Sequence, residues 1–225
     1  MRALSFFVSL AVSLCCADAA RAIDYSKINP PAEVADGIVA VGSRAVKLPP
    51  GNWTFVSYVR SNYSIPSKFI EVPLHTGYFA NVRDGRFHLG FVLELPEYSF
   101  HMTAWTNDSC NVQGEVFKST LDSNALFPEC IIVNRRNALH RNTTGSFYPP
   151  VTAWLEQQKV DQSIPIYDIW YMHYSRIGQG RIRLFVPVSM FHDQQAAIDW
   201  AKKLPSEFEA FFQGRSGTAT LSSLP

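Results

Sequence analysis

Beyond its first 22 residues, the chain has no hydrophobic stretch that is long enough to cross a membrane. A helix needs about 20 apolar residues to span the roughly 30 Å of hydrocarbon in a bilayer. The apolar run at residues 4–16 has only thirteen residues, and as a helix it rises only about 20 Å. The sequence therefore predicts a mature chain without a transmembrane segment.

The same short run has the surroundings of a cleavable export signal. Arg2 precedes it, and two A-x-A patterns of small residues follow it, ending at Ala19 and at Ala22. A positive start, an apolar centre and a small-residue cleavage site are typical of secretory signal peptides. We expect residues 1–22 to be removed and the mature chain to be periplasmic or secreted.

The mature chain also lacks an excess of charge of either sign. Of 20 Lys and Arg and 19 Asp and Glu residues, the first 22 positions hold Arg2, Arg21 and Asp18, which leaves 18 of each sign. Proteins that bind nucleic acids carry a basic excess that matches the phosphate backbone. The balance therefore excludes nucleic acid as an expected partner.

Cysteine is scarce, because only Cys110 and Cys130 of the four cysteines lie after the expected signal. Two cysteines in an exported protein are expected to pair as a disulfide. Closing a loop of this size stabilises a fold by about 3 kcal/mol on the chain-entropy model. The alternatives are a redox pair, which usually has C-x-x-C spacing, and half of a zinc site, which needs further ligands nearby. The sequence predicts a structural disulfide.

Several catalytic signatures are missing as well. The chain contains no G-x-S-x-G elbow, no H-E-x-x-H pair, no phosphate-binding glycine-rich loop and no dinucleotide fingerprint. We therefore predict no catalytic residues, no metal and no cofactor. Convergence of distant residues on folding, as in a hydrolase without a local motif, stays open. The six histidines are scattered: His75, His88, His101, His140, His173 and His192. Those in predicted strands, His88, His101 and His173, are interpreted as exposed or hydrogen-bonded residues of a strand face, with metal ligation as the alternative.

What the chain does contain is a series of short strand patterns separated by proline and glycine. The clearest is a hairpin of residues 78–83 and 86–95 around Asp84-Gly85, a dipeptide that favours two-residue turns. In residues 181–188, Arg181 and Arg183 alternate with apolar residues and are expected on the opposite face of the strand. The other predicted strands are residues 37–47, 53–60, 69–74, 100–105, 131–134 and 166–176.

Two helices are predicted in the second half of the chain. One spans residues 151–160 and starts after Pro149-Pro150. The other spans residues 193–213, with Asp193 as its cap and with Pro205 expected to kink it or split it in two. We expect one α+β domain at residues 23–215, an antiparallel sheet backed by the C-terminal helix, and a flexible tail at residues 216–225.

The densest basic stretch is the one candidate binding site that the sequence offers. It contains Arg135, Arg136, His140 and Arg141. Arginine's planar fork suits anionic groups such as lipid headgroups and polysaccharide carboxylates. The alternative is a solvated loop, and the same alternative applies to Arg176, Arg181 and Arg183.

The five tryptophans all fall in predicted strands or helices. This distribution favours a place in the core over an exposed platform for sugars. The residues are Trp53, Trp105, Trp154, Trp170 and Trp200.

Four short features together resemble a group of uncharacterised exported proteins of Gram-negative bacteria. They are L-P-P-G-x-W at residues 48–53, Trp105 ahead of Cys110, the Glu129-Cys130 step, and A-x-x-W-A…F-x-G-R at residues 197–215. Ile131 departs from the aromatic residue expected after the second cysteine. The resemblance implies a periplasmic or secreted protein and transfers no catalytic residues.

We therefore expect an exported, non-catalytic domain that acts by binding a component of the cell envelope or a small ligand. One alternative is a lipocalin-like carrier of a small hydrophobic ligand, which the Gly51-Asn52-Trp53 pattern and the series of strands favour. The helix near residue 155 and the lack of a later T-D-Y motif fit that alternative poorly. The other alternative is a secreted hydrolase without a recognisable motif.

Overall fold

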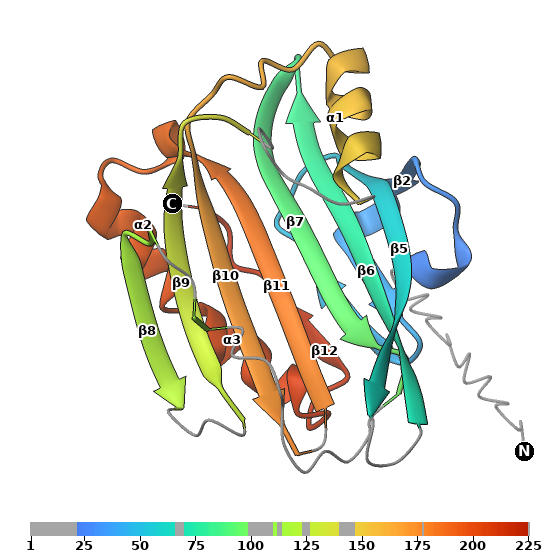
Figure 1. The fold of residues 1–225 in the computed structure, drawn as a ribbon. Coiled ribbons are helices and arrows are strands. Elements are labelled where there is room, and N and C mark those ends of the chain that lie inside the picture. Colours follow the sequence, from blue (N-terminus) through green and yellow to red (C-terminus); the bar gives the residue numbers. More distant parts are fainter. Residues whose placement is uncertain are drawn as a thin grey trace, which may run out of the picture.

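The computed structural model describes residues 22–65, 70–98, 110–111, 114–122, 127–139, 147–176 and 178–224. Within them the chain forms two β-sheets and three α-helices (Figure 1). The architecture is mainly antiparallel sheet with a helical C-terminal region, which agrees with the expected α+β class. Residues 1–21 of the expected export signal and the expected strand at 100–105 lie outside the described ranges.

The larger sheet has eight strands, and all of its pairings are antiparallel. It joins two meanders through the pairing of β7 with β11. Its end strands each have one neighbour among the described residues, so the sheet is open and the closed lipocalin arrangement is not formed. In spatial order the strands are β2 (Ala32–Val34), β5 (Trp53–Ile65), β6 (Ile70–Arg83), β7 (Arg86–Pro96), β11 (Gly178–Pro187), β10 (Ile166–Ser175), β9 (Glu129–Arg136) and β8 (Phe117–Asp122).

The turn between β6 and β7 confirms the hairpin prediction. Asp84 has φ 50° and Gly85 has φ 68°, the positive values that such a two-residue turn requires. The two separate strands expected at residues 69–74 and 78–83 were wrong, because β6 runs through both without a break. Pro73 stands opposite Asn62 in the β5–β6 ladder, but its carbonyl accepts from the N–H of Glu97 on the β7 side, just beyond the last β6–β7 pair. Because the N–H and C=O of a strand residue face the same neighbour, the missing N–H removes no bond from the β5–β6 ladder.

The smaller sheet contains four short strands in the order β1 (Ile23–Asp24), β3 (Ile38–Val41), β4 (Arg44–Lys47) and β12 (Thr218–Thr220). The single strand expected at residues 37–47 is instead the β3–β4 hairpin, which turns at Gly42 with φ 57°.

The closing segment, expected to be a flexible tail, belongs to the fold. Strand β12 pairs in parallel with β4, and the side chains of Ala219 and Leu221 are buried. The alternation of apolar and polar residues was too short to predict this strand, because only these two small or apolar side chains face the core.

The helices are α1 (Tyr148–Gln157), α2 (Gln194–Ala201) and α3 (Leu204–Phe212). Asp193 caps α2 by accepting a hydrogen bond from the N–H of Ala196 at 2.8 Å. Pro205 lies in the first turn of α3, so the predicted C-terminal helix is split in two at this proline. None of the helices in the described ranges is long and apolar enough to cross a membrane.

The two faces of the large sheet are covered differently (Figure 1). The back face packs against α2, α3 and the small sheet, and the largest apolar cluster lies there. The front face carries two smaller clusters, one beneath α1 and one around the disulfide. The Cys110–Cys130 disulfide is formed as predicted, with the two Cα atoms 6.0 Å apart.

Candidate functional site

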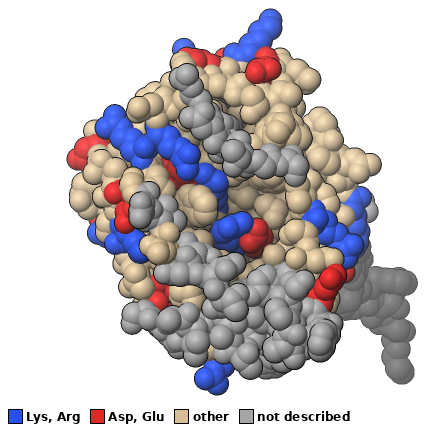
Figure 2. Space-filling model, viewed as in Figure 1, with Lys and Arg blue, Asp and Glu red and all other residues tan. Residues whose placement is uncertain are grey.

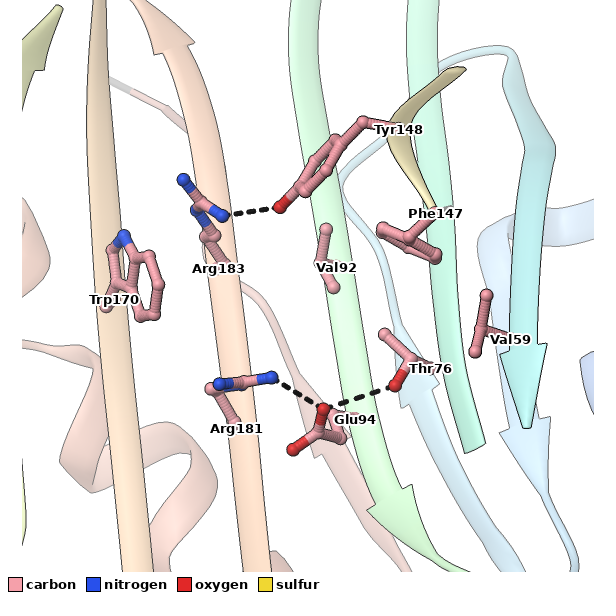
Figure 3. A pocket seen from close by; sticks show the side chains of 9 residues that line it. All are labelled: Val59, Thr76, Val92, Glu94, Phe147, Tyr148, Trp170, Arg181 and Arg183. Atoms are coloured by element: carbon pink, nitrogen blue, oxygen red, sulfur yellow. Dashed lines mark hydrogen bonds and ion pairs between the residues drawn. The ribbon is translucent and has the colours of Figure 1, made fainter. Parts of the chain in front are cut away.

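A pocket of about 270 Å³ lies on the front face, and we call it the front pocket. Its walls come from five strands and from the start of α1 (Figure 3). Trp170 on one side packs against the disulfide cluster, while Phe147 and Tyr148 on the other side pack against the α1 cluster. The lining residues are Val59, Thr76, Val92, Glu94, Phe147, Tyr148, Trp170, Arg181 and Arg183.

The register of the sheet assembles this pocket from residues far apart in the sequence. Each lining residue on a strand stands directly opposite the next one on the neighbouring strand, so that two rows form. The first row contains Val59, Thr76, Glu94 and Arg181. The second row contains Val92, Arg183 and Trp170. Side chains in such rows touch their cross-strand neighbours, so the sheet itself brings both arginines to one place.

A fully buried carboxylate, that of Asp168, anchors one side of the pocket. Its Oδ1 accepts hydrogen bonds from Trp170 Nε1 at 2.7 Å and from Arg183 Nε at 2.6 Å. Its Oδ2 accepts from Arg183 Nη2 at 2.7 Å and from Arg136 Nε at 2.6 Å. A carboxylate has about four lone-pair positions. All of them are therefore used, and Asp168 acts as a positioning group for the arginines and Trp170.

Arg183 is held on every side. Its guanidinium carbon lies 4.2 Å from the ring centre of Trp170 and 4.7 Å from that of Phe185. Its Nη1 donates a hydrogen bond to the hydroxyl of Tyr148 (Figure 3). Burial alone would lower the pKa of Arg183, but the hydrogen bonds and the charge of Asp168 raise it. The guanidinium therefore stays charged at the edge of the pocket.

Arg181 is more accessible and has fewer partners. Its Nη2 donates to Glu94 Oε2 at 2.6 Å, and the hydroxyl of Thr76 donates to the same oxygen at 3.2 Å (Figure 3). About a third of its side chain is exposed, 33%, against 11% for Arg183. The carboxylate charge of Glu94 raises the pKa of Arg181. Within the described residues, Nε and Nη1 of Arg181 have no hydrogen-bond acceptor.

The charges around the pocket do not cancel. Among the described residues, Arg136, Arg181 and Arg183 face only two carboxylates, those of Asp168 and Glu94. Burial raises the pKa of the Tyr148 hydroxyl, which therefore stays neutral at physiological pH. Figure 2 shows a band of basic side chains crossing this face toward its centre, where a basic and an acidic group lie side by side. Within the described part of the chain, the guanidinium groups at the pocket therefore exceed their carboxylate partners by one.

The basic stretch predicted from the sequence contributes only in part. Arg136 reaches Asp168 on the front face, where it joins the arginines of β11. Arg135 is exposed and, by strand alternation, points to the other face, where its pairing partner Tyr167 packs in the back cluster. His140 and Arg141 lie outside the described residues.

Sequence reasoning favoured the core for Trp170 and left Arg181 and Arg183 open between an anion-binding role and a solvated loop. The alternation along residues 181–188 did predict that both arginines share a face. Pairing between β7 and β11 was the missing information, because it brings Glu94 against Arg181 across 87 positions of sequence. Trp53 and Trp200 are buried as expected, Trp154 and Trp170 are half-buried, and Trp105 lies outside the described residues.

The described histidines do not meet in a metal site. His75 contacts the hydroxyl of Tyr58 through Nδ1 at 2.7 Å, and His173 Nδ1 lies 3.3 Å from Glu129 Oε2. No group of three or more His, Cys, Asp or Glu side chains with a metal-binding arrangement occurs in the part of the chain that the structure describes.

No family model, curated protein or solved structure matches the chain. The function proposed for the chain is therefore based on its own residues and on the chemistry of the front pocket.

Proposed function

We propose that the chain is an exported, non-catalytic domain of the cell envelope that acts by binding a small ligand in the front pocket. The binding role was expected from the sequence. The small ligand comes from the carrier alternative, although the fold is not the closed barrel of a lipocalin. The Gram-negative exported proteins that its short motifs resemble give the proposed setting, which is the periplasm or the exterior.

The export part of the proposal is supported by two features. The first is the pattern at residues 1–22, which is typical of a cleavable signal. The second is the disulfide between Cys110 and Cys130, since such bonds persist mainly in oxidising compartments.

The binding part rests on one observation: a pocket with apolar and aromatic walls presents a charged guanidinium that the fold leaves incompletely paired. Val59, Val92 and Phe147 supply apolar surface, and Arg181 supplies open N–H groups. Ligand sites typically combine apolar walls with a few converging polar groups. Asp168 uses all of its lone-pair positions for Arg183, Arg136 and Trp170, and this fixed network holds the walls in place.

Native mass spectrometry of the protein isolated from its own compartment tests this function. We expect the native mass to exceed the denatured mass by that of a small molecule. Thr76→Trp, which fills the pocket from its floor, should remove the added mass, whereas Thr120→Trp on the exposed strand β8 should retain it. Circular dichroism of both variants verifies that they fold.

Two results would argue against the proposal. One is a native mass that equals the denatured mass, together with the separate finding that the protein captures a protein partner at another surface. The other is turnover of ester, phosphate or glycoside substrates that Thr76→Trp abolishes, which would indicate a hydrolase in the same pocket.

A further inference from the structure

We propose that the ligand of the front pocket is a small amphipathic anion whose carboxylate binds Arg181 and whose apolar body lies against Val92 and Phe147. This inference rests on the binding function proposed above and names the class of ligand. It follows from three properties of the pocket: its donor groups, its net charge and its size.

The donor groups point to Arg181 as the receptor. Its guanidinium uses Nη2 for Glu94 and leaves Nε and Nη1 without acceptors among the described residues. A carboxylate bridges two adjacent nitrogens along one edge of a guanidinium, either Nε with Nη2 or Nη1 with Nη2, and Glu94 takes only one of the two N–H groups of Nη2. One edge of Arg181 is therefore open to a second carboxylate, and the neighbouring apolar walls strengthen the hydrogen bonds formed there. A second carboxylate on that edge would bond one of the open nitrogens and the remaining N–H of Nη2.

Arg183 is unsuited to the same role, although it lines the same pocket. Asp168 binds two of its nitrogen atoms and Tyr148 accepts from the third. The ring of Trp170 covers it as well. Arg183 therefore contributes charge and a rigid wall, while Arg181 contributes open donors.

The net charge favours an anion over a neutral or cationic ligand. Three guanidinium groups share two carboxylates, and Arg136 and Arg183 share the single carboxylate of Asp168. The surplus charge lies beside a pocket wall of low polarity, where it is less screened than at an open surface. A monoanion entering the pocket would neutralise it.

The size limits the apolar part of the ligand. The pocket holds about 270 Å³, just below the range of roughly 300–1,000 Å³ typical of sites for drug-sized ligands. Phe147 and Tyr148 form a T-shaped pair, with ring centres 5.2 Å apart, that closes one side. The space therefore fits a single ring or a short chain better than a long acyl chain.

Glu94 should oppose the ligand, because its carboxylate occupies part of the Arg181 fork. Its Oε2 accepts from both Arg181 and Thr76. A ligand carboxylate must bind close to this negative charge. Replacing Glu94 with neutral glutamine should therefore increase the affinity for an anion, while loss of Arg181 should decrease it.

Isothermal titration calorimetry with 3-phenylpropanoate, its neutral amide and 3-phenylpropylamine tests the proposal on the full mature chain. We expect the acid to bind at least about tenfold more tightly than the amide, as charge-assisted hydrogen bonds predict. Arg181→Gln should remove this preference, and Arg181→Lys, which keeps the charge but lacks the fork, should retain part of it. Glu94→Gln should strengthen binding of the acid, and Arg86→Gln at an exposed arginine of β7 should leave it unchanged.

The proposal is overturned if the acid and the amide bind equally, if the amine binds most tightly, or if none of the three compounds binds. Equal binding of acid and amide that Thr76→Trp abolishes would leave the binding function intact and refute only the anionic class. Absence of binding by all three compounds refutes the ligand class, and the native mass measurement then decides the function separately.

Discussion

Asp168 and Arg183 form a two-pronged ion pair, with Oδ1–Nε and Oδ2–Nη2 distances of 2.6 and 2.7 Å and a completely buried carboxylate. The pair spans neighbouring strands β10 and β11 on the front face. Its geometry fixes Trp170 and Arg183 as one wall of the front pocket. The partial exposure of Arg181 beside this rigid wall is what makes the pocket a candidate ligand site.

Asp168→Asn should destabilise the protein strongly. The amide removes the negative charge between Arg136 and Arg183 and leaves a buried guanidinium without its counter-ion. Breaking a buried pair from one side costs about 3–5 kcal/mol. Urea unfolding at neutral pH measures the difference.

The matched control is Asp199→Asn, which removes an exposed carboxylate 3.0 Å from Lys202. An exposed pair of this kind contributes little to stability, because water screens it. Equal losses of stability in the two variants would mean that Asp168 does not hold the pocket wall together.

The surroundings of Glu129 predict that part of the free energy of unfolding is lost in acid. Burial alone would raise its pKa, but contacts with His173 and with the Tyr171 hydroxyl, the latter at 2.6 Å, lower it below the ordinary value of 4.5. A carboxyl with a depressed folded pKa stabilises the fold above its unfolded pKa and loses this contribution as pH falls through the folded pKa.

Unfolding experiments on the native protein and on Glu129→Gln measure this contribution. The native protein should be the more stable of the two above about pH 4.5, and the difference should shrink steadily below that pH. A difference that stays constant down to about pH 3 would show that the pKa of Glu129 is not depressed.

Gly180→Ala should loosen the contact between β11 and α3. A Cβ atom at this position would lie 1.9 Å from the ring of Phe212, so the helix has to move away from the sheet. Forcing extra volume into a packed core costs about 1–3 kcal/mol. Thermal unfolding should show this loss, whereas Gly217→Ala, with its closest new contact at 3.5 Å, should unfold near the native temperature.

Removing the disulfide should weaken the cluster beside Trp170. Because it closes a separation of 20 residues, Cys110→Ala with Cys130→Ala should lower the free energy of unfolding by about 3 kcal/mol. Mass spectrometry of the native protein, alkylated with and without reductant, should show that both thiols are blocked. Two free thiols in the exported protein would contradict the assignment.

The local features were predictable from the sequence because neighbouring residues determine them. Asp84-Gly85 specifies its turn, and Pro205 separates α2 from α3. The disulfide followed from having two cysteines beyond an export signal. Each of these predictions needed only short-range rules of backbone geometry or cysteine chemistry.

The front pocket was not predictable, because the pairing of distant strands creates it. Alternation placed Arg181 and Arg183 on one face, but nothing in the sequence indicated that β7 would supply Glu94 to Arg181. The buried carboxylate of Asp168 lies in a strand whose other residues are mostly apolar or aromatic. The role of this carboxylate follows from its contacts with Arg136 and Arg183, which the sequence alone does not show.

The most direct test of the account is a crystal structure of the mature protein soaked with 3-phenylpropanoate. We expect the carboxylate to accept hydrogen bonds from Nη2 and from either Nε or Nη1 of Arg181, with the ring against Val92 and Phe147. A carboxylate bound away from Arg181, or an unoccupied front pocket at a saturating concentration of the acid, would contradict the account.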